Sequence, residues 1–140
     1  MSDTPQISVV VSESGNGPYG QFVTAGHHVM GADEPERVGG QDTGPSPYEF
    51  LLAALGSCTA MTVRMYAQRH AWPVEKISVA LAHEKVPAPE GNVKIDKFTR
   101  TITLTGALDD AQRARLLQIA EHCPVSQTLR RASLVDSRLA

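Results

Sequence analysis

The 140-residue chain carries only two cysteines, Cys58 and Cys123, which lie far apart in the sequence. Two thiols that meet in a folded protein can cycle between a dithiol and a disulfide. One thiolate attacks an oxidant and becomes a sulfenic acid, and the second thiol condenses with it. The alternative is a structural role, because free cysteine is a small hydrophobic residue that is often buried. From the residue pattern alone both interpretations stay open.

The local surroundings of the two thiols differ. Cys58 lies in an apolar segment with Leu51 and Met61, where burial would raise its pKa and suppress the thiolate. Cys123 directly precedes Pro124 at an expected helix start, where the helix dipole favours a negative charge. These surroundings do not decide which thiol attacks.

The segment that positions Cys58 is predicted to be a long core helix. Ser46, Pro47 and Glu49 supply an N-cap, a residue suited to the first helical position and the last residue of a capping box. No charge occurs from Phe50 to Val63, and Pro73 prevents continuation. The apolar run is shorter than a membrane span requires, so we expect no membrane association. The residues expected to point inward are Leu51, Leu55, Cys58, Thr62 and Met65.

The elements around this helix are predicted from alternation and turn residues. Strands are expected at 7–12, 21–25 and 28–30, a polar loop at 31–46, and a long hairpin from 74–84 and 98–104. Asp109 and Gln112 mark the start of a second helix that places Cys123 on its inner face with Leu116, Ile119 and Ala120. A short helix should follow at 124–129 and a closing strand at 134–139.

This order predicts an α+β fold formed by residues 1–140 as a single domain. We expect an antiparallel sheet of about six strands packed on two long helices. One such sheet covers only one side of a helix that is apolar on most of its circumference. An intertwined homodimer would cover the other side.

The composition disfavours several classes of protein. Thirteen Lys and Arg against 15 Asp and Glu give a net charge of −2, with few aromatic residues, so nucleic-acid binding is unsupported. The N-terminus has no signal-peptide pattern, so we expect a cytoplasmic location, where free or redox-active cysteines are more common than structural disulfides. A metal site from Cys58, Cys123, His122 and His28 is disfavoured, because only His122 and Cys123 are close in sequence.

The run GPSPYEFLLAALGSCTAMT, with CPV much later and a long hairpin between, resembles the OsmC/Ohr family of thiol-dependent peroxidases. The segments HHVMGADEP and GGQDTGPSPYE before the helix are most similar to its OsmC-like branch. The resemblance spans nearly the whole chain and implies an intertwined homodimer with two active sites at the interface.

The resemblance also implies roles for the two thiols. In the family the cysteine on the central helix attacks the peroxide and the second one resolves it, which makes Cys58 peroxidatic and Cys123 resolving through an intramolecular disulfide. A dithiol reductant, a lipoyl protein in the Ohr group, regenerates the disulfide, and no cofactor is implied. The implied role is reduction of organic hydroperoxides in oxidative or osmotic stress defence.

The chain departs from the family pattern in two places. The best-studied members carry an arginine in the N-terminal strand region and a glutamate just after the proline, which together hold the reactive thiolate. Here no arginine precedes Arg37, and the glutamate position is Tyr48, with Glu49 turned by about 100° on the helix. Glu49 and Cys58 lie about 13 Å apart along one helix, so Glu49 would act across the dimer interface. His28 and Arg37 are the expected activating cations.

Two functions follow from these patterns. The first is a peroxiredoxin-like hydroperoxide reductase in which Phe50, Leu51 and Met61 shape a pocket for an organic peroxide. The second is a non-enzymatic dimeric module that binds a small apolar or thiol-reactive ligand, with cysteines that have no redox role. An organic hydroperoxide should consume both thiols only under the first.

Overall fold

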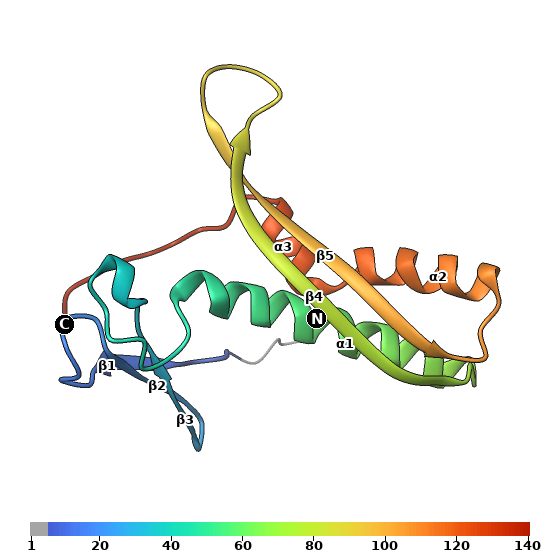
Figure 1. Ribbon diagram of the computed structural model, residues 1–140, viewed down its shortest axis with the longest axis horizontal. Coiled ribbons are helices and arrows are strands. Elements are labelled where there is room, and N and C mark those ends of the chain that lie inside the picture. Colours follow the sequence, from blue (N-terminus) through green and yellow to red (C-terminus); the bar gives the residue numbers. More distant parts are fainter. Residues whose placement is uncertain (1–5) are drawn as a thin grey trace. The chain divides into compact units, whose positions relative to one another are not determined.

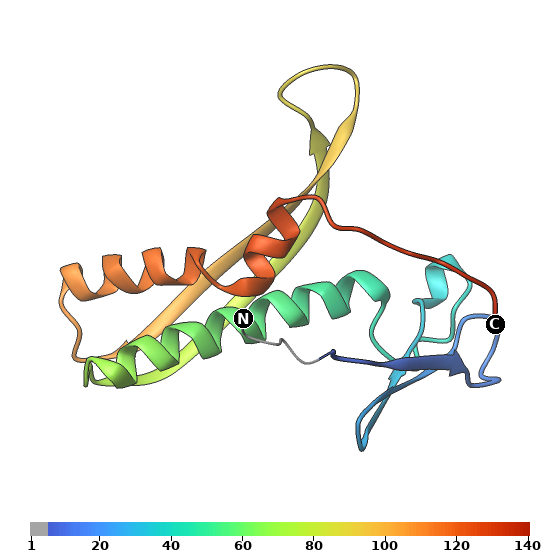
Figure 2. The same ribbon diagram turned by 180° about the vertical axis from the view of Figure 1, so that it is seen from behind.

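The structure, a computed structural model, describes residues 6–140 and shows an α+β chain (Figures 1 and 2). The chain falls into two compact units, divided between Leu51 and Leu52 within one helix. This division does not test whether residues 1–140 fold as one domain, which stays a prediction. The elements in order are β1 (Val10–Glu13), β2 (Gln21–Ala25), β3 (His28–Ala32), the 3-10 helix η1 (Glu36–Val38), α1 (Pro47–Arg69), β4 (Val74–Pro87), β5 (Lys94–Gly106), α2 (Asp110–Glu121) and α3 (Pro124–Arg130).

The first unit is a three-stranded antiparallel sheet followed by a structured loop. The strand order is β1-β2-β3, with Val11 opposite Val23 and Val23 opposite Met30. The loop after β3 folds around Asp33, which is 2 % exposed and accepts hydrogen bonds from three backbone N–H groups and a threonine hydroxyl. A short loop segment therefore has a polar centre in place of a hydrophobic core.

The predicted start of α1 is confirmed. The Ser46 N–H donates to Glu49 Oε1 at 3.0 Å, and the Glu49 N–H donates to Ser46 Oγ at 3.4 Å, the two bonds of a capping box. The helix ends at Arg69, before Pro73. By length and composition alone α1 could cross a membrane, but a core helix of a soluble protein passes the same test.

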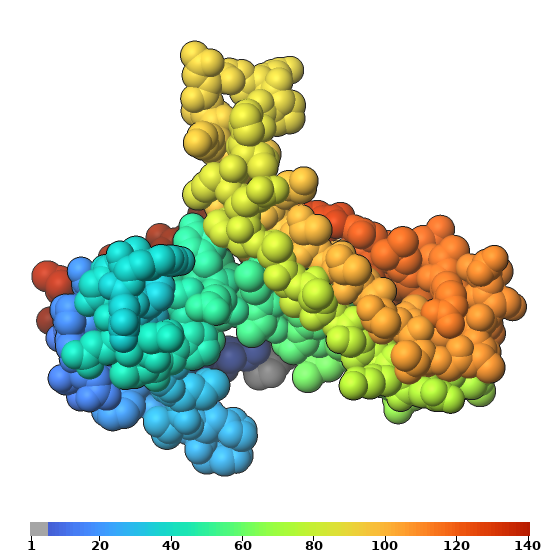
Figure 3. Space-filling view, viewed as in Figure 1, coloured from blue at the N-terminus to red at the C-terminus, as the bar shows by residue number. Residues whose placement is uncertain are grey.

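The second unit packs helices on a long hairpin. β4 and β5 pair antiparallel over almost their whole length, with Ile77 opposite Leu104 and Val79 opposite Ile102. Figures 1 and 2, from opposite sides, show the helices along one face of the hairpin, and Figure 3 shows the hairpin tip standing clear of them. The core joins α1, β4 and α2 through Val63, Ala67, Val74, Leu116 and Ala120.

The face that α1 buries differs from the expected one. The buried residues are Leu55, Gly56, Thr59, Val63 and Ala67. Of the stripe expected inside, Leu55 is buried, whereas Leu51 is 40 % and Met65 50 % exposed. The hydrophobic periodicity did not identify the buried face, because α1 is apolar around most of its surface. Gly56 lies on the buried face, where the absence of a side chain lets the helix backbone approach Leu81 of β4.

Three further expectations are wrong. β1 begins at Val10 instead of Ile7, and residues 134–139 form no strand, with Leu134 98 % exposed. A strand needs a partner for its backbone groups, and alternation in a tail does not supply one. Residues 6–140 therefore hold five strands in two separate sheets, in place of one sheet of about six. The homodimer stays a prediction.

Candidate active site

Cys58 and Thr59 reach the site from α1. Cys58 is half-buried, and Thr59 is fully buried with its hydroxyl 2.6 Å from Leu55 O. α1 approaches β4 closely at this level, since a Cβ on Gly56 would lie 2.6 Å from Leu81 Cδ1. The absence of a side chain at Gly56 thus allows this part of the helix to lie against the hairpin.

Cys123 lies between α2 and α3 and caps the second of these helices. Its Sγ accepts a hydrogen bond from the Ser126 N–H at 3.3 Å, and the residue is fully buried. The predicted capping box of α2 is present, because the Asp109 carboxylate accepts from the Gln112 N–H and the Gln112 side chain accepts from the Asp109 N–H. Pro124 occupies the first position of α3, as predicted. Local capping therefore fixes the backbone on both sides of Cys123.

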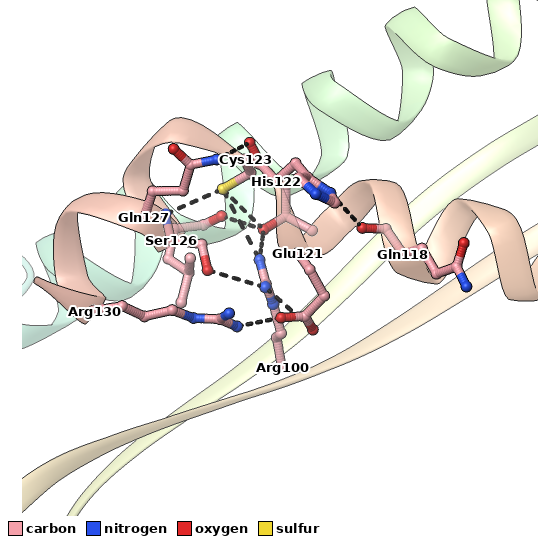
Figure 4. Close-up of polar contacts among 10 residues, drawn as sticks. Arg100, Gln118, Glu121, His122, Cys123, Ser126, Gln127 and Arg130 are labelled. Atoms are coloured by element: carbon pink, nitrogen blue, oxygen red, sulfur yellow. Dashed lines mark hydrogen bonds and ion pairs between the residues drawn. The ribbon is translucent and has the colours of Figure 1, made fainter.

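Arg100 enters the site from β5 with a side chain that is only 10 % exposed. Its Nη1 donates to Thr59 Oγ1 at 2.8 Å and lies 3.9 Å from Cys123 Sγ, and its Nη2 donates to Ser126 Oγ at 3.1 Å. Figure 4 shows the guanidinium reaching from the strand toward Cys123 and Ser126. A cation from the hairpin therefore contacts the sulfur at the end of α2.

Glu121 completes the polar site by pairing with two arginines. Its Oε1 lies 3.6 Å from Arg100 Nη2, and its Oε2 forms an ion pair with Arg130 from α3 (Figure 4). The hydrogen bond from Arg130, and then the charges of Arg130 and Arg100, lower the pKa of Glu121 against the opposing effect of burial. The ionised carboxylate thus lies beside the Arg100 guanidinium as its counter-charge.

The pKa values of the two thiols move in opposite directions. Burial raises the pKa of Cys58 against a hydrogen bond from the Val125 backbone, and the neighbouring Cys123 raises it further. Burial also acts to raise the pKa of Cys123. Hydrogen bonds from the Ser126 N–H, the Cys58 thiol, Thr59 and Arg100 outweigh it, and the net shift is downward. The surroundings of Cys123 thus favour its thiolate, whereas burial disfavours the thiolate of Cys58.

Comparison with known protein families identifies the family of the chain. The family model described as OsmC-like protein matches residues 40–138. The chain belongs to the OsmC-like family.

Solved structures share the OsmC-like fold at low sequence identity. An organic hydroperoxide resistance protein OsmC from Legionella pneumophila is 20 % identical, with 92 % of each chain covered and a TM-score of 0.69. An OsmC-like protein from Mycoplasma pneumoniae is 15 % identical (93 % and 89 % covered, TM-score 0.71). An organic hydroperoxide resistance protein from Elizabethkingia anophelis is 15 % identical (93 % and 91 % covered, TM-score 0.69). No curated protein sequence matches the chain.

Three predicted site residues of this OsmC-like chain lie in its first unit. Glu49 is engaged in the capping box with Ser46, and these bonds, followed by the charge of Arg37, lower the pKa of Glu49 against burial. His28 begins β3, with its ring 4.1 Å from that of His27. The structure gives Glu49 a local role at the helix start, and the parts of Glu49, His28 and Arg37 in catalysis stay predictions.

The predicted substrate pocket is also untested. Phe50 is half-buried, whereas Leu51 and Met61 are exposed in the single chain. Over residues 6–140, no group of three or more His, Cys, Asp or Glu side chains is arranged to hold a metal ion.

The sequence analysis missed Arg100, Thr59 and Ser126. A signal for Arg100 was present, because it stands in the alternation of FTRTITL on the side of Phe98 and Ile102, which the fold turns inward. A charged residue at an inward strand position requires buried partners. Which partners it meets depends on the long-range packing of β5 against the helices, which alternation does not specify.

Proposed function

We propose that this chain reduces organic hydroperoxides through a dithiol formed by Cys58 and Cys123. The observation that carries the proposal is that the end of α2 meets α1 beside Cys58 within the second unit, where the hydroxyl of the adjacent Thr59 lies 3.8 Å from Cys123 Sγ. Both are free cysteines. The similarity to proteins described as organic hydroperoxide resistance proteins supports the substrate class.

Exposure supports Cys58 as the peroxidatic thiol and Cys123 as the resolving thiol, since Cys58 is half-buried and Cys123 is fully buried. The Cys58 sulfur bonds to one peroxide oxygen and the O–O bond breaks. The proton lost by Cys58 is taken up by the departing alkoxide, which leaves as an alcohol. Cys123 then attacks the sulfenic sulfur, the S–S bond forms, and the hydroxyl leaves as water after taking up a proton.

A dithiol reductant closes the cycle. It gives two electrons to the disulfide, leaves as its own disulfide and restores both protein thiols. We propose a lipoyl-type dithiol as this partner, a role in oxidative or osmotic stress defence, and a cytoplasmic location. Phe50, Leu51 and Met61 are the proposed apolar contacts for the peroxide.

We further propose that the active form is a homodimer. Met61 and Met65 expose 65 % and 50 % of their surface on α1, and a second chain would remove this apolar surface from water. Light scattering at micromolar concentration should give the mass of two chains. A monomer would exclude the dimer without excluding the thiol chemistry.

The decisive experiment counts thiols. One equivalent of cumene hydroperoxide added to the reduced protein should remove both free thiols, and a dithiol should restore them. Cys123→Ser should accumulate a sulfenic acid on Cys58 that dimedone labels, whereas Cys58→Ser should keep its single thiol. Survival of both thiols in the parent protein would favour the binding module. Hydrogen peroxide in a parallel reaction tests preference for organic substrates.

A further inference from the structure

Arg100 holds a nearly buried positive charge whose contacts converge on the dithiol. A guanidinium stays protonated in proteins, and a buried charge is costly unless it is paired and hydrogen-bonded. Arg100 uses one nitrogen for Thr59 Oγ1 at 2.8 Å, with Cys123 Sγ at 3.9 Å, and the other for Ser126 Oγ at 3.1 Å. Its carboxylate neighbour Glu121 lies at 3.6 Å, slightly closer than the sulfur, but is 45 % exposed. The sulfur is thus the fully buried group near Arg100 that is able to become an anion.

The other groups around the Cys123 sulfur are also donors. The Ser126 N–H points at it from 3.3 Å. The single hydroxyl proton of Thr59 has two acceptors within reach, Leu55 O at 2.6 Å and Cys123 Sγ at 3.8 Å, so it can turn to the sulfur when charge develops there. Three elements, α1, β5 and α3, therefore each present a donor to one atom.

We propose that Arg100 is a catalytic residue of this chain, which stabilises the thiolate of Cys123 when this thiol attacks and when it leaves. The catalytic role of Arg100 rests on the proposed function. Its effect on the ionisation of Cys123 is measurable without any peroxide. The expected roles of His28 and Arg37 toward Cys58 stay predictions beside this assignment.

This assignment orders the thiol chemistry. In oxidation, Arg100 favours the thiolate of Cys123 for its attack on the sulfenic acid of Cys58, so the sulfenic acid does not accumulate. In reduction, a thiolate of the dithiol attacks the Cys58 sulfur and the S–S bond breaks. Cys123 departs as a thiolate facing Arg100, because the thiol of lower pKa is the better leaving group. The second thiol of the reductant then displaces Cys58 from the mixed disulfide.

The test titrates Cys123 alone. Cys58→Ser leaves one thiol, whose ultraviolet thiolate absorbance is followed against pH. Adding Arg100→Met should raise the pKa of Cys123 by at least about one unit, so that the thiolate fraction below that pKa falls about tenfold. Besides Arg100, the titratable and charged groups at the site are Glu121 and His122 at the end of α2 and Arg130 on α3. They are unchanged in this comparison.

Two further variants keep the result interpretable. Arg115→Met removes the same charge from α2, where Arg115 bonds to Tyr66, and should leave the titration unchanged. If Arg100→Met does not fold, Arg100→Gln keeps donors without the charge, and the same rise is expected. An unchanged titration in a folded Arg100 variant would overturn the assignment, even if the parent consumes peroxide. A clear rise in a protein that ignores peroxide would keep the assignment and reject the proposed function.

Discussion

The hydroxyl oxygen of Thr59 lies 3.8 Å from the sulfur of Cys123, although 64 positions separate the two residues in the chain. The same oxygen accepts a hydrogen bond from Arg100 at 2.8 Å. Thr59 therefore links the cation of the site to its buried thiol, one residue beyond Cys58 on the same helix.

Replacing Thr59 with valine should weaken the site and the fold together. Thr59→Val keeps the shape of the side chain but leaves a nearly buried Arg100 nitrogen without its acceptor, which costs about 1–3 kcal/mol in unfolding free energy. In a Cys58→Ser background the pKa of Cys123 should also rise, because the hydroxyl bond that lowers it is lost. Urea unfolding and thiolate absorbance measure the two effects. Thr59→Ser retains the hydroxyl, and equal behaviour of the two variants would contradict the prediction.

Acid should loosen the loop around Asp33. Hydrogen bonding by the Thr43 hydroxyl and by the backbone of residues 34, 43 and 41 lowers the pKa of Asp33 against the effect of burial. A carboxyl whose folded pKa is depressed stabilises the fold fully above its unfolded value, 3.8, and loses that contribution as pH falls through the folded value. Hydrogen-exchange protection of the Thr43 N–H should therefore fall below pH 3.8 in the parent protein.

Asp33→Asn should show weak protection of Thr43 at every pH, without the acid-dependent step. The exposed Asp42 lies in the same loop, and Asp42→Asn makes the same change of charge as a matched control. A parent-like pH profile in the Asp33 variant would show that this carboxylate does not organise the loop.

Adding a methyl group at Gly56 should separate α1 from β4. The new Cβ would stand 2.6 Å from Leu81 Cδ1, so the leucine or the helix must move. Overpacking of this kind costs about 1–3 kcal/mol, and the better helix propensity of alanine returns up to about 1 kcal/mol. We expect Gly56→Ala to lower the unfolding free energy by about 1 kcal/mol. Combining it with Leu81→Ala should cost less than the sum of the single changes, and strict additivity would mean that the two groups do not collide.

Loss of the N-cap of α2 should destabilise the second unit. Asp109→Ala removes the acceptor for the Gln112 N–H and should cost about 1 kcal/mol. Asp109→Asn keeps an acceptor and should remain near the parent. Urea unfolding followed by circular dichroism compares them, and an alanine variant as stable as the asparagine variant would be inconsistent with a cap that matters.

Elements marked by local chemistry could be predicted from the sequence. The capping boxes at Ser46 and Asp109 involve residues three apart, so their patterns carry the needed information, and both helix starts are where they were expected. The hairpin and the short helix after Cys123 also follow from turn residues and proline.

Features that depend on distant partners could not be predicted in the same way. α1 is apolar around most of its circumference, so the choice between its two possible inner faces depends on contacts such as Gly56 with Leu81. Arg100 was not among the site residues predicted from sequence, and the roles of His28 and Arg37 stay predictions. Arg100 arrives on a strand paired by long-range register. The proposed strand at 134–139 failed because alternation alone provides no pairing partner.

The shared hydroxyl of Thr59 links its evolution to that of Arg100. If an uncharged residue replaces Arg100 in a homologue, one reason to keep a hydroxyl at position 59 is lost. If the hydroxyl is lost instead, the guanidinium loses its oxygen acceptor on α1. The two positions should therefore covary among homologues, and a relative that keeps one without the other should show a compensating acceptor or anion nearby.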